Sequence, residues 1–321
     1  MSGIEIEPSP ILSCAHAVEM FDVPLFFIIS GFLYKGCVNA KDELRKIWKT
    51  LIVPYLIISG IGALIGCVLF MSEGALTINK IGKMIINILT GFDFGIGKYD
   101  LCSPLWFVYA LAIVRVIYIW AQKNKIFVIV LCLASIILMH IGNVLPFSLD
   151  SAMVGFLFFS IGYYGKNIID RIMELSLYKK VVISIICIAI LAAVGYYSDD
   201  FNSSGVITMR YMRYGKYPML YLFSSVAGTI LMFYIGKLLA TKRVCASVIL
   251  QMSTGLILIL GIHKWIYKLL FLIPLNFSSC AVLFDLMYTI AACLIGYILI
   301  VLSMKYFPLL IGGRSYNGQK K

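Results

Sequence analysis

The feature that most constrains this chain is a series of long apolar runs separated by short basic segments. A helix needs about 20 apolar residues to span a bilayer, and runs bounded by charges, Pro and Gly meet or approach that length repeatedly. The runs cover residues 11–34, 50–71, 104–121, 126–142, 150–165, 181–197, 217–236, 247–272 and 279–304. Because a backbone in lipid must satisfy its own hydrogen bonds, we expect an all-α, polytopic transmembrane helix bundle of about nine spans.

The composition excludes a water-soluble fold. Hydrophobic residues make up 61% of the 321 residues and charged residues only 13%, and the mean hydropathy is +0.97. A soluble domain has about 45–50% apolar and about 25% charged residues. No linker, low-complexity tract or visible repeat divides the chain, so residues 1–321 are predicted to form a single integral-membrane domain.

The basic residues predict how the spans are oriented. If segment 35–49 is cytoplasmic, 18 of the 27 Lys and Arg residues fall on cytoplasmic segments, six on external segments and three within spans. This bias follows the positive-inside rule and predicts an external N-terminus and a cytoplasmic C-terminus at the cell membrane. A tenth span at residues 81–92 would destroy this charge bias, so we expect 81–92 to be an amphipathic or re-entrant segment. An external start without a basic signal segment is expected if another helix precedes residue 1.

Nucleic-acid binding and metal binding are not expected. The net charge of +12 comes from clusters between the spans rather than from a basic face interleaved with aromatic residues. The nine cysteines lie mostly within apolar runs and form no CxxC pair. We interpret them as packing residues rather than as metal ligands or a disulfide framework. The lipid bilayer is the predicted partner, and the sequence leaves the oligomeric state open.

Ionisable side chains within the spans are candidate functional residues, because each costs about 2.5–3.5 kcal/mol at the bilayer centre. His263 lies in an apolar stretch and acts either as a general base toward a hydroxyl or as a hydrogen-bonding group between helices. His16 is either a functional residue or a histidine at the membrane interface, where an ionisable side chain costs little. Arg115 either binds a phosphate group or extends to the lipid headgroups. The other ionisable residues of the spans are Glu19, Asp22, His140, Asp150, Lys264, Lys268 and Asp285.

One stretch is more specific than any single residue. Residues 21–36, FDVPLFFIISGFLYKG, combine Pro24, two phenylalanines, a Ser-Gly-Phe sequence and a basic exit. They resemble the signature helix of the family-three membrane acyltransferases. Later stretches are similar to further motifs of that family in the expected order: KTLIVPY at 49–55, PLWFVYAL at 104–111, LDSAMVGFLFFSIGYYGKN at 149–167 and STGLILILGIHKWIY at 253–267. The resemblance covers the chain from about residue 21 to residue 304.

The resemblance implies a membrane-bound O-acyltransferase. Such an enzyme takes an acyl group from acyl-CoA at the cytoplasmic side and passes it to a hydroxyl of a sugar or surface polysaccharide. The expected donor is acetyl-CoA, with another acyl-CoA as the alternative. No metal is expected. The candidate residues are His263 and His16 as catalytic bases, Arg45, Lys46 and Arg115 as ligands of the CoA phosphates, and Ser30, Gly31, Trp106 and Asp285 along the substrate path.

The chain departs from the family pattern at its start. The family's usual base is a histidine on the first helix, with an arginine about three turns before it, and no such pair precedes Pro24. We expect that a first helix is missing; the alternative is that His16 has taken over its role. Two other functions stay open. One is a transporter or flippase for lipid-linked sugars, although no inverted repeat is visible, and the other is a non-catalytic remnant of the acyltransferase family.

Overall fold

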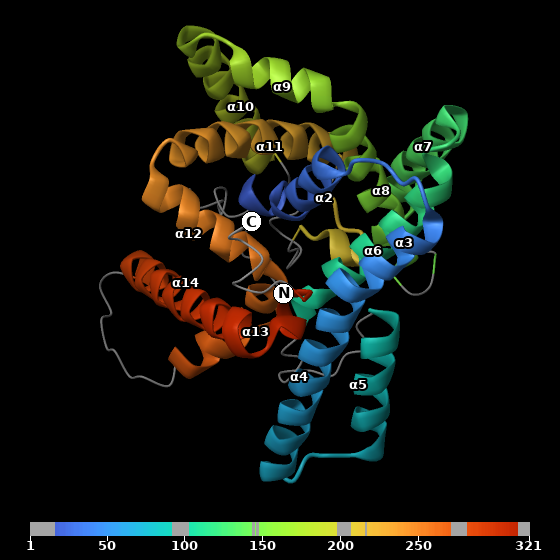
Figure 1. Cartoon of the computed structure of the whole chain (residues 1–321), viewed down its shortest axis with the longest axis vertical. Helices are drawn as coiled ribbons and strands as arrows, with labels where there is room; N and C mark the ends of the chain where they lie inside the picture. Colours follow the sequence, from blue (N-terminus) through green and yellow to red (C-terminus); the bar gives the residue numbers. More distant parts are fainter. Residues whose placement is uncertain are drawn as a thin grey trace, which may run out of the picture. The chain divides into compact units, whose positions relative to one another are not determined.

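The computed structural model describes residues 17–91, 103–142, 145, 148–197, 207–215, 217–270 and 281–313, with only the backbone of 103, 196–197 and 281–285. Within these ranges the chain is helical, and its one β-type pairing is an isolated bridge between Thr208 and Arg213. The prediction of an all-α chain is confirmed. Labelled as in Figure 1, the α-helices are α2 (Asp22–Leu33), α3 (Ala40–Ile47), α4 (Val53–Ser72), α5 (Ile78–Thr90), α6 (Trp106–Ala121), α7 (Lys125–Ile141), α8 (Leu149–Tyr164), α9 (Lys166–Glu174), α10 (Leu177–Tyr197), α11 (Pro218–Ala240), α12 (Arg243–Thr254), α13 (Leu256–Leu270) and α14 (Ala281–Tyr306).

Two compact units make up the chain, and each is built from two segments of the sequence. Unit 1 consists of Met1–Val38 and Ile113–Lys242, and unit 2 consists of Asn39–Ala112 and Arg243–Lys321. The boundary between the two units lies within helix α6: its residues up to Ala112 belong to unit 2, and those from Ile113 onward belong to unit 1. The single integral-membrane domain over residues 1–321 stays a prediction.

Unit 1 is organised around the contact between α2 and α8. The two backbones meet at a pair of glycines. A Cβ atom on Gly31 would lie 2.0 Å from the carbonyl oxygen of Phe159, and one on Gly162 would lie 2.0 Å from that of Ile28. Lipid gives helices little hydrophobic drive to associate, so close approach through small residues is an important source of stability.

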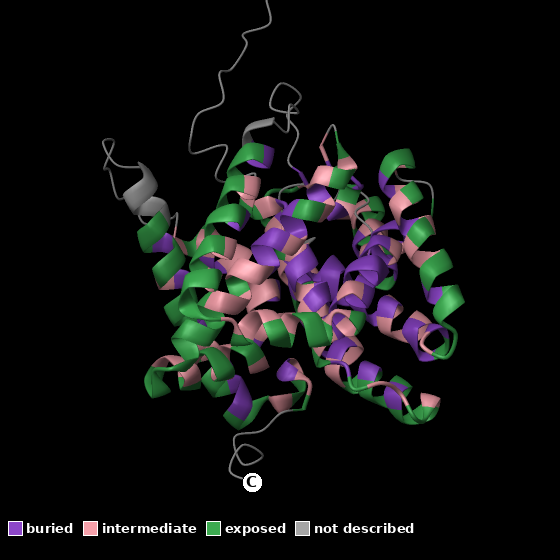
Figure 2. Ribbon diagram, turned by 90° about the horizontal axis from the view of Figure 1, so that it is seen from above, coloured by how far each residue is buried: buried purple, intermediate pink, exposed green. Residues whose placement is uncertain are grey.

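A cluster of aromatic rings fills the core of unit 1 beside this crossing. Tyr118 of α6 is fully buried. Its ring centroid lies 5.7 Å from that of Tyr34, 4.8 Å from that of Phe159 and 5.3 Å from that of Tyr163, at angles between tilted and edge-to-face. Aromatic pairs favour these arrangements because the ring edge is positive and the face negative. Figure 2 shows the buried residues of the described chain in purple.

Unit 2 contains the α4–α5 hairpin and the three helices α12, α13 and α14. Helices α4 and α5 lie side by side (Figure 1). Helix α5 begins at the Thr77 side-chain cap and ends at Gly91, whose φ of 66° suits a glycine. With 13 residues it is shorter than a span, in agreement with the predicted amphipathic segment. In the second group, α13 packs on both α4 and α14.

The described helices support a polytopic membrane protein. By length and hydropathy four of them could cross a membrane, or up to six if each of two bent pairs counts as one span. The four are Ala40–Ser72, Leu177–Gly195, Pro218–Ala240 and Leu286–Tyr306. Helices α6 and α7 are apolar but shorter. The count of nine stays a prediction, because parts of the first and last predicted spans lie outside the described residues.

The eighth predicted span, 247–272, is interrupted in the structure. Helices α12 and α13 meet at an angle of 84°. Between them stands Gly255, and a Cβ there would lie 2.3 Å from Cγ1 of Ile300. An α14 side chain therefore fills the space that a larger residue at the bend would need. Hydropathy reports the length of an apolar run and not its direction, so the sequence did not predict this bend. A second bend lies between α8 and α9, which meet at an angle of 56°.

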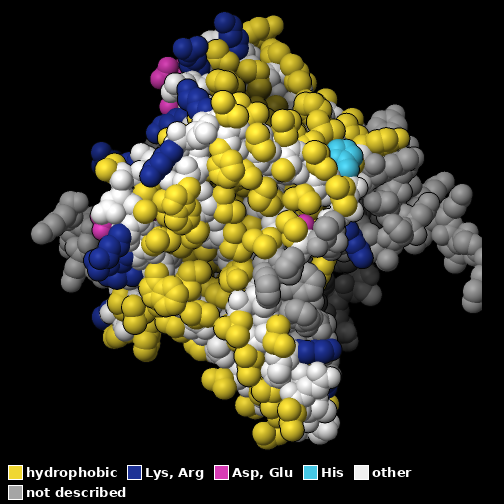
Figure 3. Space-filling model, turned by 90° about the vertical axis from the view of Figure 1, so that its right-hand side faces the viewer, with side chains coloured by type: hydrophobic (Ala, Val, Ile, Leu, Met, Phe, Trp, Pro, Cys, Tyr) yellow, Lys and Arg dark blue, Asp and Glu magenta, His cyan; other side chains and the backbone are white. Residues whose placement is uncertain are grey.

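The outward faces of the helices are hydrophobic. Helix α7 carries four large aliphatic side chains that are each more than half exposed: Ile126, Ile129, Leu133 and Ile137. In helix α10, only 11% of the most apolar stretch is buried within the protein. Hydrophobic side chains, yellow in Figure 3, cover much of the face shown there. A water-soluble monomer rarely exposes apolar patches beyond a few hundred Å². These surfaces fit contact with lipid, as expected of a membrane protein.

Candidate functional site

In unit 2, helix α13 carries the histidine that the sequence singles out, and a glycine brings this helix close to α4. The place of a Cβ on Gly261 would be 2.4 Å from Cγ2 of Ile58 and 3.4 Å from Cδ1 of Leu105. Because Gly261 stands two residues before His263, this packing fixes the backbone from which the imidazole projects. The α13 backbone at His263 is therefore held by packing on α4 and on the chain preceding α6.

His263 is half-buried, and one of its ring nitrogens is occupied. Its Nδ1 lies 3.1 Å from the carbonyl oxygen of Ile259, one turn earlier. A carbonyl only accepts, so this hydrogen bond places the proton on Nδ1 and leaves the lone pair on Nε2. The Tyr267 ring stands edge-on to the imidazole, with centroids 6.4 Å apart, and its hydroxyl is 3.1 Å from Oγ1 of Thr289. A neutral imidazole oriented in this way can accept a proton through Nε2.

Trp106, assigned to the substrate path, begins α6 and is buried in the core of unit 2. Near it in the sequence, the Tyr109 ring lies 5.8 Å from that of Tyr55, whose hydroxyl donates to the carbonyl of Ile88 at 2.8 Å. Helix α6 therefore enters unit 2 through a set of packed aromatic rings. Trp106 is only 7% exposed, so its burial accounts for a large apolar side chain at this position whether or not a substrate passes it.

Arg45 and Lys46, the predicted ligands of the CoA phosphates, lie in the last turn of α3 and are exposed. The helix is capped by Asn39, whose side chain accepts from the backbone of Lys41 at 3.0 Å. Its one buried charged residue is Glu43. Both cationic side chains are thus accessible to an anionic ligand.

Unit 1 holds Ser30, Gly31 and Arg115. Gly31 contacts the α8 backbone, whereas Ser30 beside it is half-exposed. Arg115 is half-buried on α6. The predicted residues therefore fall into two sets, one in each unit. His16 and the side chain of Asp285 lie outside the described residues.

The structure also gathers acidic residues and tyrosines that the sequence did not connect. Asp22 at the start of α2 interacts electrostatically with Glu19 and with Tyr221 of α11. The Tyr221 ring stands 4.8 Å from that of Tyr214, measured between centroids. Asp150 of α8 is 2% exposed and raises the Tyr214 pKa. We call Glu19, Asp22, Asp150, Tyr214 and Tyr221 the acid–tyrosine cluster.

Within the acid–tyrosine cluster, Tyr214 is held as a neutral phenol. Its hydroxyl donates to Sδ of Met212 at 3.0 Å. Burial raises the pKa of Tyr214 well above its ordinary value, and the nearby Asp150 raises it further. The segment that carries Tyr214 is tied to α8, where the Ser151 hydroxyl donates to the carbonyl of Met209 at 3.0 Å. No sequence pattern predicts this contact, because it joins residues 58 positions apart.

The described part of the chain contains no group of three or more His, Cys, Asp or Glu side chains placed to hold a metal ion. The free cysteines in those ranges are Cys37, Cys67, Cys132, Cys187, Cys245 and Cys293. The ionisable groups of interest are thus the imidazole of His263, the acid–tyrosine cluster and the basic residues of α3 and α6.

Comparison with known proteins gives one match. The model of an acyltransferase domain, that of acyltransferase family 3, matches residues 3–305. No curated protein and no solved structure is similar enough to this chain to count as a match. The matched range includes every motif on which the resemblance was based, from residues 21–36 to residues 253–267.

Proposed function

Because the chain belongs to the family-three membrane acyltransferases, we propose that it transfers an acyl group from acyl-CoA to a hydroxyl of a sugar or surface polysaccharide, with acetyl-CoA as donor. The observation that carries this proposal is the family match over residues 3–305, nearly the whole chain. The apolar outward faces of the helices support a multi-pass protein of the cell membrane. The charge bias supports a cytoplasmic C-terminus and hence a cytoplasmic supply of the donor.

We assign the general base of this reaction to His263, with His16 as the second candidate. The bond from Nδ1 to the Ile259 carbonyl supports the first choice, because it leaves Nε2 as the acceptor. In the proposed step Nε2 takes the proton of the acceptor hydroxyl while its oxygen attacks the thioester carbonyl. The C–S bond then breaks, the CoA thiolate leaves, and the imidazolium returns the proton to the sulfur.

The donor is proposed to be held through its phosphates. Arg45 and Lys46 are exposed in the last turn of α3, and Arg115 is half-buried on α6. Arginine suits phosphate because its planar, permanently charged fork makes paired hydrogen bonds. Ser30, Gly31, Trp106 and Asp285 are proposed to lie along the substrate path.

The direct test is acyl transfer by the purified protein in proteoliposomes. Radiolabelled acetyl-CoA is supplied with a panel of sugars and polysaccharides, and labelled ester is measured. We expect H263Q to lower the transfer rate by about 10²-fold or more, as loss of a general base does. H140Q is the matched control, because His140 is an exposed histidine at the end of α7 whose Nδ1 is bonded to a carbonyl in the same way.

Three outcomes would contradict these assignments. If H263Q retains full activity while H16Q loses it, the base is His16. If both variants are active, neither histidine is the base. If labelled sugar crosses the vesicle membrane without gaining an acyl group, the chain is a transporter. The same assay on a chain extended upstream in frame tests the expectation that a first helix with its own histidine belongs to the enzyme.

A further inference from the structure

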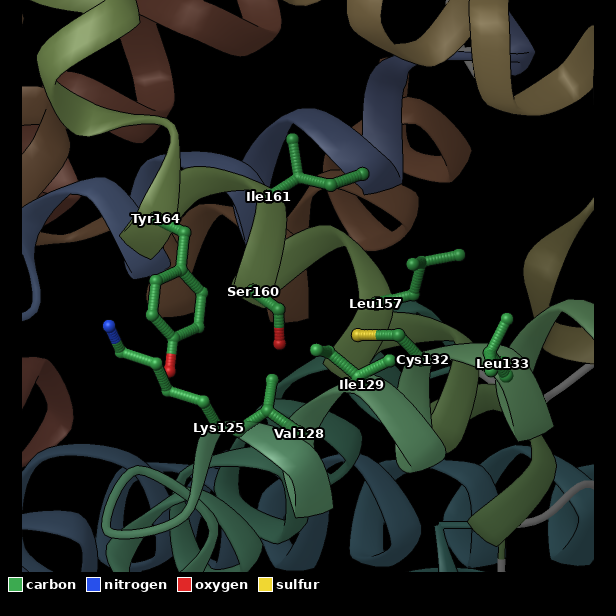
Figure 4. Close-up of a pocket in the computed structure, with 9 residues that line it drawn as sticks. All are labelled: Lys125, Val128, Ile129, Cys132, Leu133, Leu157, Ser160, Ile161 and Tyr164. Atoms are coloured by element: carbon green, nitrogen blue, oxygen red, sulfur yellow. The ribbon is translucent and has the colours of Figure 1, made fainter.

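A groove runs between α7 and α8 on the surface of unit 1 (Figure 4). Its volume is about 410 Å³. Most of its lining is aliphatic, with Ile129 and Leu133 on one side and Leu157 and Ile161 on the other. The acyltransferase reaction proposed above makes no use of this space, which we call the α7–α8 groove.

Two features of the helix packing keep the groove open. Helix α7 is tied to α8 at Ser135, whose hydroxyl is 2.6 Å from the carbonyl oxygen of Met153. Helix α8 is held from its other side by α2, through the backbone contact at Gly31 and Gly162. Between these fixed positions two of the side chains that line the groove are small. Cys132 of α7 and Ser160 of α8 point into the groove and do not fill it (Figure 4).

The groove opens toward the outward surface rather than toward the core. Ile129 is 57% exposed and Leu133 is 55% exposed, and both belong to the apolar outward face of α7. A hydrocarbon chain in the surrounding bilayer can therefore enter from the side without crossing the protein. If a methylene group occupies about as much space as a water molecule in the liquid, about 30 Å³, the groove has room for roughly a dozen of them.

One end of the groove is polar and cationic. Lys125 is the first residue of α7 and Tyr164 is the last residue of α8, and the two side chains lie next to each other at the groove's end (Figure 4). Two further cations, Lys123 and Lys166, adjoin these residues in the sequence. The sequence places this end at the cytoplasmic side, where anionic lipids gather. The α7–α8 groove therefore complements an anionic lipid: its aliphatic lining suits an acyl chain, and the lysine and the phenol at its end suit a phosphate group.

We propose that the α7–α8 groove binds an anionic phospholipid of the surrounding leaflet, with one acyl chain along the groove and the phosphate at Lys125 and Tyr164. The phospholipid is favoured over the acyl-CoA donor because the groove faces the bilayer. Basic pockets between membrane helices on the cytoplasmic side are a recurring binding site for anionic headgroups. The binding is independent of acyl transfer, so it can be tested in an inactive variant.

The test is photo-crosslinking in nanodiscs with a diazirine placed in the acyl chain. Phosphatidylglycerol carrying the probe is compared with phosphatidylcholine carrying it, and labelled peptides are identified by mass spectrometry. We expect phosphatidylglycerol to label the α7 and α8 groove peptides about fivefold more, the factor that corresponds to one lysine near an anionic headgroup. K125Q should remove that preference, whereas K179Q, a matched change at an exposed lysine of α10, should not.

A second pair of variants tests the apolar part of the site. C132F places a large side chain in the groove and should lower the labelling by both lipids, while I137F changes an exposed α7 residue outside the groove lining and should leave it unchanged. Equal labelling by the two lipids, or labelling spread evenly over α7 and α10, would overturn the proposal. Loss of labelling on addition of palmitoyl-CoA would assign the groove to the acyl donor instead and would also overturn it. Each variant's thermal unfolding shows whether it is folded.

Discussion

The substitution G31A tests whether the α2–α8 crossing stabilises this protein. A methyl group at position 31 would meet the carbonyl oxygen of Phe159 at 2.0 Å, the carbonyl carbon at 2.9 Å and the backbone nitrogen of Tyr163 at 3.0 Å. All three atoms belong to the backbone, so no rotamer change can relieve the clash. In real structures a Cβ atom essentially never lies closer than 3.0 Å to a heavy atom of another part of the chain. The helices would therefore have to separate by about 1 Å at their crossing.

The expected cost follows from two opposing terms. Overpacking of a tight contact typically costs about 1–3 kcal/mol, and a backbone contact belongs at the upper end. Replacing Gly by Ala within a helix returns about 0.5–1 kcal/mol. We therefore expect G31A to lower the free energy of unfolding by about 2 kcal/mol. G162A should cost a similar amount because its methyl group would meet the carbonyl oxygen of Ile28, also at 2.0 Å.

The assay is equilibrium unfolding of the detergent-purified protein by SDS, followed by tryptophan fluorescence. G236A is the control, since this α11 position has no neighbouring atom within 4 Å of a Cβ; it should be neutral or slightly stabilising. The double variant G31A/G162A should cost less than the sum of the single changes, because one separation of the helices relieves both clashes. If G31A is as stable as G236A, or if the double variant is simply additive, the backbone crossing does not stabilise the fold in the way described.

Three further predictions concern the polar contacts of unit 1. Q122A removes an amide that accepts from the backbone N–H of Cys37 at 3.0 Å and donates to its carbonyl at 3.1 Å; we expect a loss of about 1–2 kcal/mol in SDS unfolding, and no loss would contradict it. K237M removes the hydrogen bond that Nζ of Lys237 donates to the Met173 carbonyl at 2.7 Å. We expect faster amide hydrogen exchange in the last turn of α9, and an unchanged exchange rate would contradict this contact. The raised pKa of Tyr214 gives stability that is complete below the ordinary pKa of about 10 and is lost as the pH rises toward the folded-state value. Y214F should flatten this alkaline decline, and an unchanged slope above pH 10 would count against a buried phenol.

The candidate site could be predicted from sequence only in part. His263 is identifiable because an ionisable side chain within an apolar run is energetically costly and is therefore a candidate functional residue. Its hydrogen bond to the carbonyl of Ile259, four residues earlier, follows from the local geometry of the helix. The acid–tyrosine cluster is different. Asp150 and Tyr214 are 64 positions apart in the sequence, and the fold of segment 207–215 against α8 brings them near each other. No pattern within one helix predicts a contact of that kind.

The sequence by itself determined that the chain is helical, apolar and polytopic, and that it belongs to a family of membrane acyltransferases. These properties depend on the length and polarity of single segments and on short motifs, all of which are local. Only the tertiary structure decided that the run 247–272 bends at Gly255, that α2 and α8 meet backbone to backbone, and that a groove stays open between α7 and α8. Each of these depends on which side chain of another helix occupies a given space, and such contacts are fixed when the helices pack together.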